Sequence, residues 1–140
     1  MFRRILFAHN ATPAAERALI YLEHIARLEG AKIIVLHVYQ PPDRYTAMAG
    51  YGALVEQFEQ VAHEVVDDTV EYLQKAGISA VGMIAADNSP ARVILRTADD
   101  EEASLILLGT RGPAKVADLL LGDVSTEVLR NARCPVFLVP

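Results

Sequence analysis

Five short apolar runs, separated by longer segments, constrain the fold of this chain more than any other feature of its sequence. The runs cover residues 4–9, 32–39, 78–85, 104–108 and 135–139. Most of them lack the alternation of apolar and polar residues that a sheet with one solvent-exposed face requires. The first, second and fourth runs are therefore predicted to be strands that are covered on both faces, as in a parallel sheet, and the third run is a weaker strand.

The segments between these runs carry apolar residues at three- and four-residue spacing, which is the pattern of helices with one buried stripe. Helices are predicted at residues 14–29, 53–76 and 124–131, with a further helix that starts at Ser89 and Pro90. Strands that alternate with helices imply right-handed parallel crossovers, with helices on both faces of the sheet. We therefore predict one α/β domain over residues 1–140, built on a doubly wound five-stranded parallel sheet in the order 3-2-1-4-5.

Composition and charge narrow the class of protein. At 140 residues the chain is long enough to bury a core without a disulfide or a metal. Its net charge of −5 comes without a basic block or face, which argues against nucleic-acid and membrane-surface partners. The single cysteine, Cys134, cannot form an intrachain disulfide and is predicted to be a buried structural thiol. With no signal peptide and no apolar stretch of about 18 residues, the protein is expected in the cytoplasm.

In a doubly wound sheet, ligands bind outside the carboxyl ends of the strands where the winding reverses, here between the first and fourth strands. Residues 9–12 follow the first strand, and residues 109–112 follow the fourth. The second segment begins a spaced set of glycines, Gly109-x2-Gly112-x9-Gly122, and the last of them opens the final helix. Glycines allow close backbone approach and positive φ, and backbone N–H groups at a helix N-terminus attract anions. The pattern is that of a phosphate site or, alternatively, of simple turn glycines.

This glycine spacing resembles the ATP-binding motif of the nucleotide-binding universal stress proteins. The likeness covers nearly the whole chain, through the segments RILFAHNAT, KIIVLHVY, NSPARVI, SLILLGTRG and CPVFLVP. It implies an adenine nucleotide alpha hydrolase-like fold and a homodimer. It also implies that ATP or AMP binds, with or without Mg²⁺, in the crevice between the first and fourth strands.

The resemblance assigns roles to individual residues. Asn10 stands where the family has an aspartate that contacts the adenosine part, and Val38 stands where a backbone contacts adenine. The three spaced glycines line the phosphates, and Ser125 offers a hydroxyl near them. The complete predicted nucleotide site consists of Asn10, Ala11, Thr12, Val38, Gly109, Arg111, Gly112, Gly122, Asp123, Val124 and Ser125.

Three positions depart from the family pattern. Asn10 replaces the aspartate and loses a charge-assisted hydrogen bond, while Ala11 replaces a glycine and restricts φ in the turn. Asp123 replaces a phosphate-facing serine or threonine, and its carboxylate would repel a phosphate. Mg²⁺, or Arg111 and Lys115 in the same loop, would offset that repulsion. In the alternative interpretation Asp123 only caps the helix and the two cations only face solvent.

Catalytic and metal-binding patterns are missing from the sequence. His9 and His37 lie near the carboxyl ends of adjacent predicted strands, but no cysteine or carboxylate with ligand spacing accompanies them. They are predicted to be core or rim histidines. The sequence contains no nucleophile elbow, His-Glu-x-x-His motif or Walker lysine motif. The chain is therefore expected not to be an enzyme, with slow ATP hydrolysis at most, and a hydrolase of the adenine-nucleotide kind is the least favoured hypothesis.

Two functional hypotheses remain from the sequence. The first is a nucleotide-binding stress-response module in which ATP or AMP occupancy changes shape or partner choice. The second is a dimeric interaction module whose degraded site no longer binds nucleotide. The retained glycines favour the first, whereas Asn10 and Asp123 favour the second. In both, residues 135–139 are predicted to form an apolar edge strand that pairs with a second copy in a two-fold homodimer, and an unidentified regulatory partner is expected.

Overall fold

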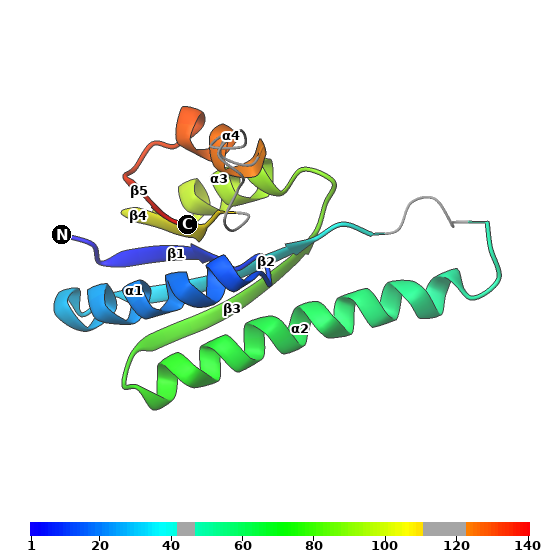
Figure 1. Ribbon diagram of the computed structural model, residues 1–140, viewed down its shortest axis with the longest axis horizontal. Coiled ribbons are helices and arrows are strands. Elements are labelled where there is room, and N and C mark those ends of the chain that lie inside the picture. The colour runs from blue at the N-terminus through cyan, green and yellow to red at the C-terminus, as the bar shows by residue number, and fades with distance from the viewer. Residues whose placement is uncertain (42–46, 111–122) are drawn as a thin grey trace.

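The described residues form a sheet of five parallel strands in the computed structural model, which covers residues 1–41, 47–110 and 123–140 (Figure 1). The strands are β1 (Arg4–Ala8), β2 (Lys32–Tyr39), β3 (Ser79–Ala86), β4 (Leu105–Gly109) and β5 (Val136–Val139). Their order across the sheet is β3-β2-β1-β4-β5, and every neighbouring pair is parallel. The predicted fold class and strand order are therefore confirmed.

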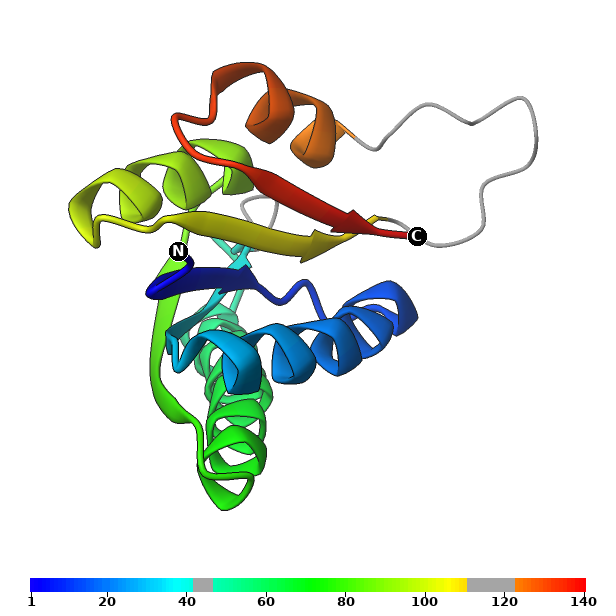
Figure 2. The ribbon, with the colours of Figure 1, turned by 90° about the vertical axis from the view of Figure 1, so that its left-hand side faces the viewer.

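Helices connect the strands and cover both faces of the sheet. They are α1 (Pro13–Glu29), α2 (Tyr51–Lys75), α3 (Pro90–Asp100) and α4 (Asp123–Asn131). Figure 2 shows α1 and α2 on one side of the sheet and α3 and α4 on the other. Within β1, Ile5 and Phe7 contact the first pair of helices, whereas Leu6 and Ala8 contact the second pair. Both faces are buried at the central strands β1, β2 and β4, which therefore need no polar alternation, as the sequence indicated. The edge strand β3 is more exposed, with Val81 at 42% and Met83 at 37%.

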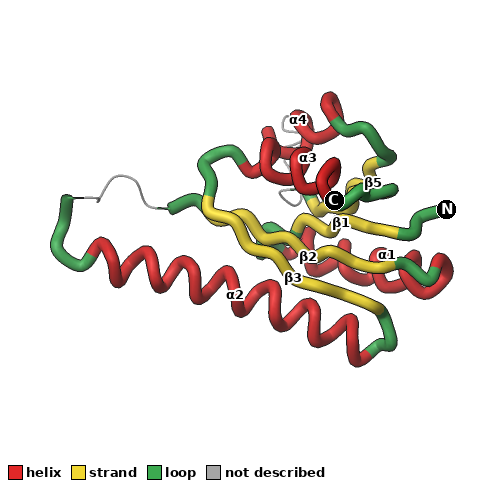
Figure 3. The backbone as a smooth tube through the Cα atoms, turned by 180° about the vertical axis from the view of Figure 1, so that it is seen from behind, coloured by secondary structure: helices red, strands yellow, loops and turns green. Residues whose placement is uncertain are grey.

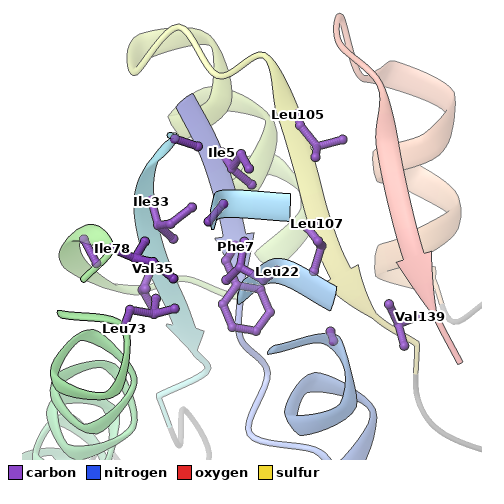
Figure 4. Close-up of a cluster of buried hydrophobic side chains, with 14 of the residues drawn as sticks. Ile5, Phe7, Leu22, Ile33, Val35, Leu73, Ile78, Leu105, Leu107 and Val139 are labelled. Atoms are coloured by element: carbon purple, nitrogen blue, oxygen red, sulfur yellow. The ribbon is translucent and has the colours of Figure 1, made fainter. Parts of the chain in front are cut away.

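The larger core cluster lies beneath α1 and α2 (Figure 4). Phe7 of β1 is fully buried there, with Leu22 of α1 and Leu73 of α2. Full burial of a side chain of this size contributes roughly 1.5–3 kcal/mol to stability. This packing fixes α1 against the centre of the sheet, so the turn between β1 and α1 has a rigid support at each end.

Helix α1 begins and ends with residues that are typical of helix termini. Thr12 is the N-cap, and its Oγ1 accepts a hydrogen bond from the backbone N–H of Ala15 at 3.3 Å. Pro13 occupies the first helical position, where a missing N–H costs nothing. Gly30 ends the helix in the left-handed conformation, with φ of 61°.

Helix α2 begins earlier than predicted, at Tyr51 rather than residue 53, and takes in Gly52. Its N-cap is Gly50, which offers no side-chain cap, so the sequence contains no capping signal at this end. Figure 3 shows that the N-terminal part of α2 extends beyond the end of the sheet. The predicted strands at residues 4–9 and 135–139 differ from β1 and β5 by one residue at one end, and those at 78–85 and 104–108 are displaced by one residue from β3 and β4.

Two further properties of the fold bear on function. None of the helices in the described ranges is both long and apolar enough to cross a membrane.

Cys134 is half-buried, and burial, with a smaller effect of Asp99, raises the pKa of its thiol. The thiol therefore stays protonated at neutral pH, which agrees with the structural role predicted for it.

Candidate functional site

A cavity of about 270 Å³ opens at the carboxyl ends of β1, β2 and β4, where α3 and α4 cover the sheet. It coincides with the point where the chain winds in opposite directions away from β1, which is where the sequence predicts a crevice. Its described lining residues are Ala8, His9, Asn10, Thr12, Leu36, Val38, Gln40, Pro90, Ile94, Leu108, Gly109, Val124 and Ser125.

Six of the predicted site residues line this cavity together, although they come from four separate segments. They are Asn10, Thr12, Val38, Gly109, Val124 and Ser125. Ala11 lies beside the cavity and instead lines a second one between α1 and α2. The predicted site residues Arg111, Gly112 and Gly122 lie outside the described residues, as does Lys115. The side chain of Asp123 also lies outside them.

The turn between β1 and α1 is held by its own side chains. The Oδ1 of Asn10 accepts hydrogen bonds from the Thr12 backbone N–H at 3.2 Å and from the Thr12 hydroxyl at 2.5 Å. This acceptor is therefore occupied, and the Asn10 amide offers a ligand mainly its N–H donors. Ala11 has φ of 61°, a left-handed conformation that costs a non-glycine residue roughly 1–2 kcal/mol. Alanine thus adopts the backbone conformation expected of glycine, at an energetic cost.

His9 fixes this turn from the sheet side. Its Nδ1 accepts a hydrogen bond from the backbone N–H of Ala11 at 3.0 Å, and its Nε2 lies 3.1 Å from Glu16 Oε1. Its carbonyl accepts a hydrogen bond from His37 Nδ1 at 2.6 Å. Burial, and to a lesser extent His37, lower the pKa of His9 despite the opposing effect of Glu16. Among the described residues, no three His, Cys, Asp or Glu side chains are grouped so as to hold a metal ion.

The backbone of Val38 presents a donor and an acceptor to the crevice. Residues along a strand point their N–H and C=O alternately to the two neighbouring strands. The Leu36 carbonyl accepts from the His9 N–H at 2.8 Å, and the Tyr39 carbonyl accepts from the Asp87 N–H beside β3 at 3.1 Å. The N–H and C=O of Val38 therefore point to the side of β1. Because β1 ends at Ala8, no further strand residue meets them there.

Gly109 lines the cavity, but the close contact that requires a glycine lies on its other side. A Cβ at this position would lie 2.5 Å from the Ala14 carbonyl carbon and 2.6 Å from the Ala15 nitrogen. Gly109 is also absent from the glycines of the described segments that have positive φ. Positive φ is therefore wrong as the reason for this glycine, which is required for the close packing of α1 on β4. Its place beside the phosphates stays a prediction.

Sequence reasoning missed the α3 side of the cavity and the residue that follows β2. Pro90 and Ile94 lie one turn apart on α3 and close the cavity from above the sheet. Gln40 follows β2, and its Nε2 donates to the Asn88 carbonyl at 3.4 Å. Gln40 could have been predicted as a lining residue, because it is a polar residue directly after a buried strand that reaches the crevice.

The cavity is lined mainly by apolar side chains, with a few polar groups among them. Leu36, Ile94 and Leu108 supply apolar surface, whereas Asn10 and Ser125 supply hydrogen-bonding groups. No lysine, arginine, aspartate or glutamate occurs among its described lining residues. Such a space suits a flat group with apolar faces and a polar edge, and it offers no described charge to a charged substrate.

Residues 1–140 match the universal stress protein family. A universal stress protein of Thermus aquaticus is 32% identical over 139 residues, and the alignment covers 99% of each chain. The solved structure of MJ0577, a universal stress protein of Methanocaldococcus jannaschii, has a TM-score of 0.86 at 24% identity and covers 99% of this chain and 96% of that one.

Two other solved universal stress proteins carry nucleotides. One, from Archaeoglobus fulgidus, is in complex with dAMP, with a TM-score of 0.73 at 21% identity over 100% of this chain and 98% of that one. The other is in complex with cAMP, with a TM-score of 0.74 at 19% identity over 99% of this chain and 96% of that one. At these identities the likeness shows the fold that the chains share.

Proposed function

Because this chain belongs to the universal stress protein family, we propose that it binds an adenine nucleotide, ATP or AMP, in the crevice between β1 and β4 and acts as a stress-response or regulatory module. The observation that carries the proposal is the cavity at the carboxyl ends of the central strands, with apolar walls and the Val38 backbone at its edge. The dAMP and cAMP complexes of structural relatives support the same ligand class.

The adenine ring fits the chemistry of the inner part of the cavity. Its faces are apolar and would lie among side chains such as Leu36 and Ile94. Its edge carries an amino group that donates and a neighbouring ring nitrogen that accepts. The Val38 C=O and N–H offer the complementary acceptor and donor. A backbone pair of this kind recognises the base without a hydrogen bond from the Val38 side chain.

The sugar and phosphates are assigned to the opening of the cavity. The Asn10 amide would donate to a ribose oxygen, because its own acceptor is occupied by Thr12. Gly112, Gly122 and Arg111 are assigned to the phosphates on the glycine spacing of the family motif. Mg²⁺, if it accompanies ATP, would bind between the phosphates and the Asp123 carboxylate, since Mg²⁺ prefers oxygen ligands.

The proposed role is binding without dedicated catalysis, in a cytoplasmic homodimer of single-domain subunits. Strand β5 supports the assembly, since it lies at the end of the strand order and its outer edge has no strand partner in the described chain. Phe137 on β5 is 36% exposed, and its ring centroid lies 5.7 Å from that of Tyr21 on α1. An edge strand with an exposed aromatic side chain is a template for pairing with a second copy.

The alternative, an interaction module that has lost its ligand, is favoured by one observation. The described lining of the cavity contains no cationic side chain, so nothing described neutralises a phosphate. Under this alternative the cavity would be inherited geometry, and the homodimer alone would carry the function.

Two experiments separate the alternatives. Freshly purified protein is denatured, and any released nucleotide is identified by mass spectrometry. Calorimetric titrations with ATP, ADP and AMP are then run on the wild type, on Val38→Trp, which fills the cavity, and on Val81→Trp. Val81 lies on β3, is 42% exposed and provides a matched control outside the cavity.

We expect the wild type and Val81→Trp to bind, and Val38→Trp to lose binding while it still unfolds cooperatively. If the wild type binds none of the three nucleotides at millimolar concentration with Mg²⁺ present, the nucleotide-binding proposal fails and the interaction module replaces it. Equal binding by Val38→Trp would place the ligand elsewhere and overturn the assignment of the site.

A further inference from the structure

His9 lies between two cavities of this molecule. On one side it lines the crevice, and on the other it lines a groove between α1 and α2 that also contains Glu16. The imidazole itself is almost completely buried, beneath the Phe7 ring at a centroid distance of 5.4 Å. A buried titratable group that contacts a binding turn can change the shape of that turn when its charge changes.

The hydrogen bonds fix the tautomer of His9. The backbone N–H of Ala11 can only donate, so His9 Nδ1 must accept from it and cannot carry a proton. The remaining proton is then on Nε2, which donates to Glu16 Oε1. The observed arrangement therefore requires the neutral Nε2–H imidazole. In the protonated ring both nitrogens are donors, and Nδ1–H would face the Ala11 N–H.

The conformation of Ala11 within the turn depends on this one acceptor. Ala11 is held in a left-handed conformation that alanine rarely adopts, and among the described residues its N–H has only His9 Nδ1 as partner. Asn10 and Thr12 flank Ala11, and both line the crevice. If the Ala11 N–H loses its acceptor, the backbone is expected to relax out of the left-handed region, and the two flanking side chains move with it.

We infer that His9 is a positioning residue for the turn of Asn10, Ala11 and Thr12, and that it holds this turn only while its imidazole is neutral. Opening of the turn on protonation of His9 requires no bound ligand. The consequence for ligand binding rests on the proposed nucleotide function.

The charged and titratable groups around His9 set the direction of the effect. Glu16 of α1 attracts a proton to His9, and His37 of β2 opposes it. Glu64 and Asp68 of α2 line the same groove. Burial opposes protonation most strongly, so the pKa of His9 lies below its ordinary value of 6.5. The turn is therefore closed at pH 7 and opens as the pH falls through that lowered pKa. The side chain of Glu16 is 68% exposed, whereas that of His9 is 2% exposed.

Two substitutions separate the functions of the two ring nitrogens. In His9→Asn the amide oxygen takes the place of Nδ1 and can accept from the N–H two residues ahead, as in an Asx-turn, without titrating. In His9→Gln the longer amide can donate to Glu16 in place of Nε2 but leaves the Ala11 N–H without its acceptor. At pH 7 we expect His9→Gln to bind AMP about two- to tenfold more weakly than His9→Asn, the effect of one hydrogen bond.

The decisive experiment is a nuclear magnetic resonance titration of the wild type without ligand between pH 8 and about pH 5. The His9 ring nitrogens and the Ala11 amide should titrate with one shared midpoint below 6.5, and exchange of the Ala11 amide with solvent should accelerate through it. In His9→Asn the Ala11 amide should not respond over the same range.

The inference is overturned if the Ala11 amide stays unchanged while His9 titrates, or if both variants keep the turn equally well. The wild-type titration needs no variant to fold and no ligand to bind. A shared midpoint without any nucleotide affinity would therefore support the positioning role and refute the proposed function, so the two claims fail separately.

Discussion

The contact between β4 and α1 allows one stability prediction to be worked from the structure. In Gly109→Ala the new Cβ would lie 2.5 Å from the Ala14 carbonyl carbon, whereas ordinary van der Waals contact begins near 3.4 Å. The clash is with backbone, so no side-chain rotation can relieve it. Helix α1 or strand β4 must therefore move by about 0.9 Å at a point where both are buried.

Overpacking of this kind destabilises a protein by roughly 1–3 kcal/mol. For a domain of this size that lowers the melting temperature by roughly 3–12 °C. Urea denaturation and differential scanning calorimetry measure the two quantities. Because α1 carries the turn of Asn10, Ala11 and Thr12 at its N-terminus, the displacement should also weaken AMP binding.

Gly52→Ala is the matched control for this substitution. A Cβ at Gly52 meets nothing within 4 Å, and the residue lies inside α2 without positive φ. There the change should stabilise the protein by roughly 0.5–1 kcal/mol, because alanine is the better helix former. If Gly109→Ala were as stable as the wild type, the argument that packing requires this glycine would be refuted.

Three further substitutions test other parts of the account. Ala11→Gly removes the left-handed strain but adds conformational freedom to the unfolded chain. We therefore expect the free energy of unfolding in urea denaturation to rise by about 0.5–1 kcal/mol, and a decrease would contradict the claim that Ala11 is strained. Asp123→Ser should tighten ATP binding without Mg²⁺ by about tenfold, and AMP binding by less. Weaker Mg-ATP binding would indicate that Mg²⁺ bridges Asp123 and the phosphates, and unchanged titrations would indicate that Asp123 only caps the helix. Phe137→Glu should convert the proposed dimer to monomers in light scattering, because it places a charge on the exposed edge strand, and an unchanged dimer would place the interface elsewhere.

Most of the fold was predictable because its signals are local. The uninterrupted apolar runs and the helical spacing between them determine the element types, and the alternation of strands and helices leaves few topologies. The ends of α1 were predictable because Thr12 acts through its own side chain, and Pro13 and Gly30 act through their own backbone. The start of α2 was not, since Gly50 and Gly52 carry no capping side chain.

The position of the cavity was predictable, but the structural roles of the residues around it were only partly so. The switch point follows from topology alone, and it brings Asn10, Val38 and Ser125 together. The reason for Gly109 depends on how closely α1 approaches β4, which no local pattern encodes. Likewise, the hydrogen bond from Ala11 to His9 requires a left-handed backbone that an alanine does not suggest.

The central claim is that the crevice recognises adenine through the backbone of Val38. The most direct test follows the backbone amide of Val38 by nuclear magnetic resonance during separate titrations with AMP and with inorganic tripolyphosphate. The account predicts that the Val38 amide shifts and saturates with AMP, and that tripolyphosphate leaves it unchanged because that anion has no base. A Val38 amide that does not respond to AMP, or that responds equally to tripolyphosphate, would contradict adenine recognition at this position.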